Sequence, residues 1–326
     1  MNLIGEYTDI VEGHVLPVAI QLGTTVELEV GGEQVRLRSV DEPASALVPL
    51  RCPDPATVSP AWARYVAAVV DEVGPDEGGS GEVTTTLPIG AGLSSSAALE
   101  VAVALAVGFE GTAGELASAC QRAEQRASGV PCGVMDQLAS AAGVDGHALL
   151  IDCATTATAP VALPDDVAIV VFDSGQRRSL AEGTAYAERR AACERAAARI
   201  GPLRVAAAGD VAALPDPVER RRARHVVTEE ARVHAMVDAL ERRDVATAGE
   251  ILLAGHASLR DDFEVSTPVL DALVERLAAS PGVHGARLTG AGFGGSVVAL
   301  CDPDRVPPAG LVVRASAGAR VQVVHP

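Results

Sequence analysis

The chain contains no lysine. All 26 cationic residues among its 326 residues are arginine, against 43 acidic residues, and the formal net charge is −17. Without lysine, the phosphate-binding loop GxxxxGK[ST] cannot form. A strongly acidic chain also repels phosphate backbones, so we expect no nucleic-acid partner.

Long hydrophobic runs are also lacking. The longest apolar stretches, such as AALEVAVALAVGF at residues 97–109, are shorter than the roughly 18 to 20 residues that a membrane span needs. No cationic segment followed by an apolar stretch precedes them. We therefore predict no signal peptide, no membrane partner and a cytoplasmic location.

Cysteine and histidine lack the spacings that are typical of disulfide frameworks and metal sites. The six cysteines are scattered without a CxxC pair, which favours reduced and mostly buried thiols. The seven histidines form neither HxxxH nor HExxH. The sequence therefore predicts no structural zinc site.

What is present is an alternation of strand-like and helix-like segments, which predicts an α+β chain. Residues 15–37 are strand-like, with a hairpin-type turn at Gly31-Gly32. Residues 60–74 and 113–129 have helical spacing and end at glycine. The length favours two domains, and the Thr/Pro/Ala-rich residues 155–166 suit a domain junction.

The segment LPIGAGLSSSAALE at residues 87–100 is the strongest chemical motif. A glycine-rich turn followed by serines at a helix start offers free N–H groups and the positive end of the helix dipole to an anion. A nucleoside triphosphate is the natural ligand, whereas an ordinary serine N-cap gives the same pattern. The candidate binding residues are Gly90, Gly92, Ser94, Ser95 and Ser96.

A second glycine-rich segment contains a formal GxGxxG at Gly290, Gly292 and Gly295. A dinucleotide-binding fingerprint requires a helix after the turn, but SVVALC at residues 296–301 is strand-like. We therefore interpret this segment as a glycine-lined wall beside a ligand or as a β-turn.

Two carboxylates on separate predicted elements, Glu124 and Asp136, suit magnesium-dependent phosphoryl transfer. One carboxylate would bind Mg²⁺ and the other would lie near the accepting hydroxyl. Either residue, taken alone, is equally well a solvated surface carboxylate. Tyr186, in an Arg/Glu-rich helical segment at residues 173–197, is a candidate to stack on a ligand or to pack in the core.

Four segments in this order resemble the GHMP kinases, and within them the galactokinase branch. They are NLIGEYTD at 2–9, the segment at 87–100, CGVMDQLAS at 132–140 and LTGAGFGGSVVAL at 288–300. The resemblance implies a two-domain fold with a ribosomal-protein-S5-like N-terminal domain at 1–160 and a ferredoxin-like C-terminal domain at 161–326. It also implies an active site in the cleft between these domains, and a monomer or weak oligomer.

The resemblance further implies the roles of individual residues in an ATP- and Mg²⁺-dependent sugar 1-kinase. Asp136 would be the catalytic residue beside the anomeric hydroxyl, and Ser96 and Glu124 would hold Mg²⁺. Trp62 would wall the adenine pocket, and the serine loop would wrap the ATP phosphates. The residues implied to contact the sugar are Glu6, Tyr7, Asp9, Gly133 and Tyr186.

The chain departs from the family pattern RVNLIGEHTDYN in two respects. The family arginine has no counterpart before Asn2, and we expect a start codon further upstream, with a naturally short and impaired chain as the alternative. Tyr7, Ile10 and Val11 replace family histidine, tyrosine and asparagine, which leaves galactose or a related sugar as substrate. Other open alternatives are a non-catalytic sugar and ATP sensor, and a mevalonate- or homoserine-kinase-like enzyme.

Overall fold

The computed structural model describes residues 1–88, 92–176 and 182–323. The chain forms two compact units, each described here by itself. The first unit comprises residues 1–21, 89–93 and 144–316, and the second comprises residues 22–88, 94–143 and 317–326.

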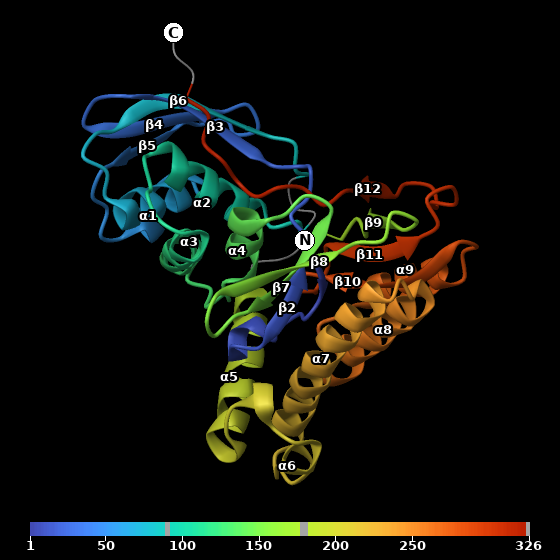
Figure 1. Cartoon of the computed structure of the whole chain (residues 1–326). Helices are drawn as coiled ribbons and strands as arrows, with labels where there is room; N and C mark the ends of the chain where they lie inside the picture. Colours follow the sequence, from blue (N-terminus) through green and yellow to red (C-terminus); the bar gives the residue numbers. More distant parts are fainter. Residues whose placement is uncertain (89–91, 177–181, 324–326) are drawn as a thin grey trace. The chain divides into compact units, whose positions relative to one another are not determined.

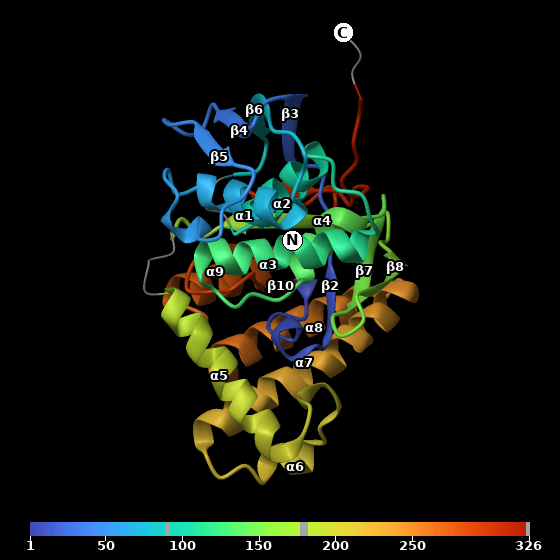
Figure 2. The same cartoon turned by 90° about the vertical axis from the view of Figure 1, so that its left-hand side faces the viewer.

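The second unit combines a sheet with a layer of helices. Its strands follow the order β3-β6-β4-β5, with bounds β3 Thr24–Val30, β4 Gln34–Ser39, β5 Ala46–Pro49 and β6 Gly79–Thr85. Its helices are α1 Ala63–Val73, α2 Ser95–Ala106, α3 Ala113–Ser128 and α4 Met135–Ala142. Helices α1 and α2 lie beneath the sheet, and α3 packs against both of them (Figures 1 and 2).

The predicted hairpin at Gly31-Gly32 is wrong. Strand β6 lies between β3 and β4, antiparallel to β3 and parallel to β4, and Gly78 hydrogen-bonds to both Gly31 and Gly32. Strand β6 can enter this narrow position because of its glycines: a Cβ on Gly81 would lie 1.9 Å from the carbonyl oxygen of Glu27. The sequence pattern between residues 15 and 37 carries no information about this later strand.

The helices of the second unit follow the expected local signals. Helix α1 buries one side, including Val66 and Val70, and ends at Gly74 with a left-handed φ of 64°. Helix α3 starts with a capping box in which Thr112 and Glu115 each bond the other's backbone N–H. The predicted helices at 60–74 and 113–129 are confirmed.

The first unit contains two sheets. One has the order β1-β2-β7-β8, with bounds β1 Asn2–Ile4, β2 His14–Pro17, β7 His147–Asp152 and β8 Ala157–Ala162. The other has the order β10-β11-β9-β12, with bounds β9 Ala168–Asp173, β10 Val283–Thr289, β11 Ser296–Cys301 and β12 Leu311–Val313.

The helices of the first unit lie C-terminal to β9. They are α5 Glu182–Ile200, α6 Ala208–Ala212, α7 Pro217–Glu241, α8 Val245–Ser258 and α9 Pro268–Ala278. Helices α8 and α9 pack on β10, and α7 packs on α8 (Figure 1). No helix in the described part of the chain is long and apolar enough to span a membrane.

The continuous domains predicted at 1–160 and 161–326 do not coincide with these compact units. Residue 160 lies inside β8, which pairs with β7 along its whole length, so half of the Thr/Pro/Ala-rich stretch is a strand. The first unit also includes the N-terminal residues 1–21. Strand β1 pairs with β2, and β2 pairs with β7, so the start of the chain joins the same sheet as residues 147–152.

Candidate active site

The serine-rich loop opens helix α2 with backbone groups that no side-chain cap covers. Ser94 occupies the N-cap with a left-handed φ of 58°, and its side chain makes no capping hydrogen bond. Ser94, Ser95 and Ser96 are all partly exposed, and Gly92 before them has a φ of 73°. An uncapped helix start of this kind fits an anion, which supports the anion-binding interpretation over a self-capping serine. Gly90 lies outside the described residues.

Two carboxylates, the buried Glu100 on α2 and the partly buried Glu124 on α3, lie close to Ser96. The hydroxyl of Ser96 donates to Glu124 Oε1 on α3 at 2.8 Å. Gln137 on α4 donates through Nε2 to Glu124 Oε2 at 2.5 Å and to Glu100 Oε2 at 3.0 Å. Three helices of the second unit therefore bring two acids, an amide and a hydroxyl together.

Acidic side chains outnumber cationic ones in this cluster. Burial, the neighbouring Glu124 and Asp136 raise the pKa of Glu100 well above its usual value. Burial and Asp136 also raise the pKa of Glu124, while the hydrogen bond from Ser96 opposes that shift. Among the described residues, Glu100 Oε1 and Gln137 Oε1 are buried without a hydrogen-bond partner. A cation that prefers oxygen ligands would neutralise the neighbouring negative charges and provide a partner for the unpaired oxygens.

Sequence reasoning missed Glu100 and Gln137. Glu100 lies four residues after Ser96, on the same face of α2, and is a charged residue within an otherwise apolar helix. A single acidic residue in an apolar helix was the sequence signal that could have identified Glu100. Gln137 follows Asp136 directly, and nothing in the local pattern marks it.

The other predicted residues of the second unit occupy separate local positions. Asp136 is in the first turn of α4, partly exposed, and its charge acts on both Glu100 and Glu124. Gly133 belongs to the turn that precedes α4. Trp62 is the N-cap residue of α1, and its indole N–H donates to the carbonyl oxygen of Ala44 at 3.0 Å.

In the first unit, Glu6 belongs to a buried ion-pair network. Its carboxylate pairs with Arg287 and accepts the backbone N–H of Gly290 at 3.2 Å. Arg287 also donates to Glu229 Oε1 at 2.8 Å, and neither of these two side chains is exposed. The observed partners of Glu6 are thus protein groups, and its predicted sugar contact stays a prediction.

The two buried carboxylates that share Arg287 have pKa values shifted in opposite directions. Burial raises the pKa of Glu6 to about 7, against the attraction of Arg287. Burial acts in the same direction on Glu229, but Arg287 and Arg232 outweigh it and lower that pKa to about 2. Arg287 and Glu229 were not singled out from the sequence because their meeting depends on β10 and α7.

The structure brings Tyr7 and Tyr186 together. Tyr7 has a φ of 69°, and its hydroxyl donates to the carbonyl oxygen of Ala291 at 2.5 Å. Its ring lies 5.3 Å from the ring of Tyr186 and 4.4 Å from that of Phe263. Tyr7 is buried, Tyr186 is partly buried, and Asp9, the first residue of the short 3₁₀ helix Asp9–Val11, is partly exposed.

The second glycine-rich segment connects β10 to β11, so the strand predicted after it is confirmed and the dinucleotide interpretation is excluded. A Cβ on Gly292 would lie 2.3 Å from the carbonyl oxygen of Val265, and one on Gly294 would lie 2.7 Å from that of Gln176. The glycines are thus needed for close packing of this loop against its neighbours.

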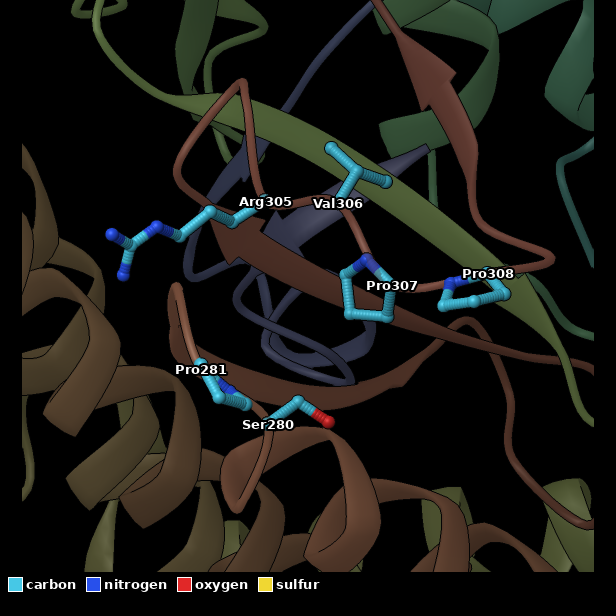
Figure 3. Close-up of a pocket in the computed structure, with 6 residues that line it drawn as sticks. All are labelled: Ser280, Pro281, Arg305, Val306, Pro307 and Pro308. Atoms are coloured by element: carbon cyan, nitrogen blue, oxygen red, sulfur yellow. The ribbon is translucent and has the colours of Figure 1, made fainter.

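An open hollow of about 400 Å³ lies elsewhere in the first unit. Figure 3 shows its lining residues, Ser280, Pro281, Arg305, Val306, Pro307 and Pro308. The Arg305 side chain extends away from Pro307 and Pro308. None of the predicted site residues lines this hollow, and it contains no group of converging polar side chains.

A glycine-serine loop at an open helix start, next to Glu100 and Glu124, suits the binding of a phosphate group, and family comparisons identify the class of protein. The family described as "GHMP kinases N terminal domain" matches residues 62–144, and "GHMP kinases C terminal" matches residues 236–316. The "Galactokinase galactose-binding signature" matches residues 1–29. The fold is that of a GHMP kinase.

Similar proteins identify the branch. The chain is 41% identical to human galactokinase over 95% of its own length and 83% of that protein, and 40% identical to the galactokinase of Chloroflexus aurantiacus over 94% and 83%. The structure of Lactococcus lactis galactokinase complexed with galactose superposes with a TM-score of 0.89 and 31% identity, covering 97% of this chain and 92% of that one. The chain belongs to the galactokinase family, as its sequence motifs predict.

More distant structures share the fold. Methanococcus jannaschii mevalonate kinase superposes with a TM-score of 0.68 at 18% identity, over 97% of this chain and 95% of that chain. This likeness concerns the fold alone.

Proposed function

We propose that the chain is a galactokinase: it transfers the γ-phosphoryl group of ATP to the anomeric hydroxyl of galactose and forms galactose 1-phosphate. The observation that carries this proposal is the galactose-binding signature at residues 1–29, in a chain 41% identical to human galactokinase. The likeness to a galactokinase structure that contains galactose supports the same substrate. The proposed location is the cytoplasm.

The start of α2 is the proposed ATP phosphate site. Gly92, Ser94, Ser95 and Ser96 offer backbone N–H groups and hydroxyls where the helix dipole favours negative charge. We assign Gly90 to the same loop from its place in the sequence motif. Trp62 is the proposed wall of the adenine pocket.

Ser96 and Glu124 are the proposed Mg²⁺ ligands. Their oxygens are hydrogen-bonded to each other, and the surrounding acids are in excess over cations, which suits a hard divalent ion. When bound, such an ion neutralises charge on the ATP phosphates. Gln137 holds the second oxygen of Glu124 and so fixes the direction of the first.

Asp136 is the proposed catalytic residue. A carboxylate beside the anomeric hydroxyl orients that hydroxyl and accepts its proton as the new O–P bond forms. Asp9, Tyr7, Tyr186, Gly133 and Glu6 are the proposed contacts of the remaining sugar hydroxyls. Phosphoryl transfer needs little more than this positioning and charge stabilisation.

The test is ADP release by the purified chain with Mg-ATP and a panel of free sugars, run beside Asp136→Asn. We expect turnover with galactose, a loss of about 10²-fold or more in kcat for Asp136→Asn, and a melting temperature close to that of the parent. Asp145→Asn, a change of the same kind on an exposed loop, is the control. Preference for another sugar, or full turnover by Asp136→Asn, would contradict the proposal.

A further inference from the structure

Three metal-ligating side chains from distant parts of the chain meet in the first unit. They are His14 at the start of β2, and Glu230 and His234 on α7, which packs against β2 (Figure 1). One ligand atom from each residue lies within 4.8 Å of the other two. Glu230 Oε1 lies 2.5 Å from His14 Nδ1 and 3.6 Å from His234 Nε2.

The carboxylate of Glu230 is held so that one oxygen faces both imidazoles. Its other oxygen, Oε2, accepts the backbone N–H of His14 at 2.8 Å. Gly13 makes this approach possible, because a Cβ at that position would lie 2.7 Å from Oε2. Glu230 and His234 are four residues apart and therefore share one face of α7.

We propose that His14, Glu230 and His234 form a binding site for a divalent transition-metal ion of the zinc class, with solvent in the fourth position. Two imidazole nitrogens and one carboxylate oxygen are a ligand set that zinc accepts, whereas Mg²⁺ prefers oxygen alone. The site is accessible, since 54% of the His234 side chain is exposed. It is separate from the proposed Mg²⁺ ligands, which belong to the second unit.

The observed spacing needs only a small adjustment to receive an ion. With bonds of about 2.1 Å, tetrahedral ligand atoms lie about 3.4 Å apart. The 3.6 Å between Glu230 Oε1 and His234 Nε2 already fits this value. The 2.5 Å between His14 Nδ1 and Glu230 Oε1 increases when the ion replaces the hydrogen between these two atoms. The two imidazole rings lie close together, with centroids 4.7 Å apart in a T-shaped arrangement.

A bound ion would connect β2 to α7 and stabilise the folded state in proportion to its occupancy. The test is a Zn²⁺ titration of the full, metal-free chain by calorimetry and by thermal melting, without nucleotide or sugar. We expect one ion to bind and the melting temperature to rise. His234→Ala, a change at an exposed position, should weaken this binding about tenfold or more.

His284→Ala is the matched control, because the partly exposed His284 pairs with Asp302 at 2.8 Å and belongs to no three-ligand group among the described residues. Its Zn²⁺ affinity should equal that of the parent. The proposal would be overturned if His234→Ala bound Zn²⁺ as tightly as the parent. It would also be overturned if His234→Ala and His284→Ala lost the same amount of Zn²⁺ affinity.

Co²⁺ absorption distinguishes this site from binding by a cysteine thiolate. Cys153 is a free thiol that interacts electrostatically with Glu230, so it is the competing ligand to exclude. We expect d–d bands without a thiolate-to-cobalt band, and the appearance of that band would contradict the proposed ligands. Because no kinase assay is involved, failure here leaves the proposed function untouched.

Discussion

Gln137 connects the buried Glu100 to the partly buried Glu124 in the second unit. Its amide nitrogen donates to both Glu100 and Glu124, so the orientation of Glu124 depends on a residue that the sequence motifs do not mark. The hydrogen bond from Ser96 fixes the other oxygen of Glu124. At the residue scale, the proposed metal ligand is thus oriented by three helices.

Gln137→Leu should weaken divalent-cation binding about 10- to 100-fold, because Glu124 loses the group that orients it. Mn²⁺ binding followed by electron paramagnetic resonance measures this without turnover. Gln121→Leu is the matched control: Gln121 donates to the carbonyl oxygen of Cys132, which Gln125 also satisfies. Unchanged Mn²⁺ affinity in Gln137→Leu would contradict the orienting role of Gln137.

His225 gives the fold a measurable pH dependence. It is fully buried, bonded to Ser258 and to the carbonyl oxygen of Glu6, and burial lowers its pKa to about 4. The unfolded chain binds a proton near pH 6.5, so the stability that His225 contributes is complete above that pH. It is lost as pH falls toward 4.

Comparing the parent with His225→Gln isolates this contribution, since Glu6, whose pKa is raised to about 7, changes stability in the opposite direction over the same range. When the pH falls from 7.5 to 5, the unfolding free energy of the parent should decrease by about 2 kcal/mol more than that of the variant. Urea unfolding at both pH values measures this. His147→Gln, at the start of β7, is the control, and parallel pH profiles for the parent and His225→Gln would contradict the assignment.

At the element scale, the contact between α8 and β10 depends on a helical glycine. A Cβ on Gly249 would lie 2.1 Å from the carbonyl oxygen of His284, a backbone atom that cannot move without shifting the strand. This close approach lets α8 cover β10 directly. The helical pattern of α8 gives no sign of it.

Gly249→Ala should therefore destabilise the chain by about 2 kcal/mol or more, although alanine is the better helix former. Gly209→Ala in α6 is the matched control, because its Cβ would meet no atom within 4 Å. That variant should be neutral or more stable by up to about 1 kcal/mol. Chemical denaturation of both variants provides the measurement, and equal effects would refute the packing argument.

At the scale of the whole molecule, the net charge of −17 affects the stability of the folded state. Mutual repulsion among 43 acidic residues opposes the compact state, and salt screens it. We expect the melting temperature to rise between about 20 and 300 mM KCl. A melting temperature that falls with salt would contradict this expectation.

The sequence by itself determined the features that depend on neighbouring residues. The capping box at Thr112, the glycine end of α1 and the glycine-serine loop before α2 arise from local hydrogen bonds and local φ preferences. The family motifs also gave the family and, through it, the proposed catalytic residue Asp136. These features require no knowledge of distant strands.

Only the tertiary structure decided which distant residues meet. The insertion of β6 between β3 and β4, the pairing of Glu6 with Arg287 and the meeting of His14 with Glu230 all join segments far apart in the chain. Such contacts form because sheet registers and helix packing place them, and a local pattern contains neither. The sequence motifs therefore predicted the chemistry, whereas the interactions that support the proposed site became visible only in the fold.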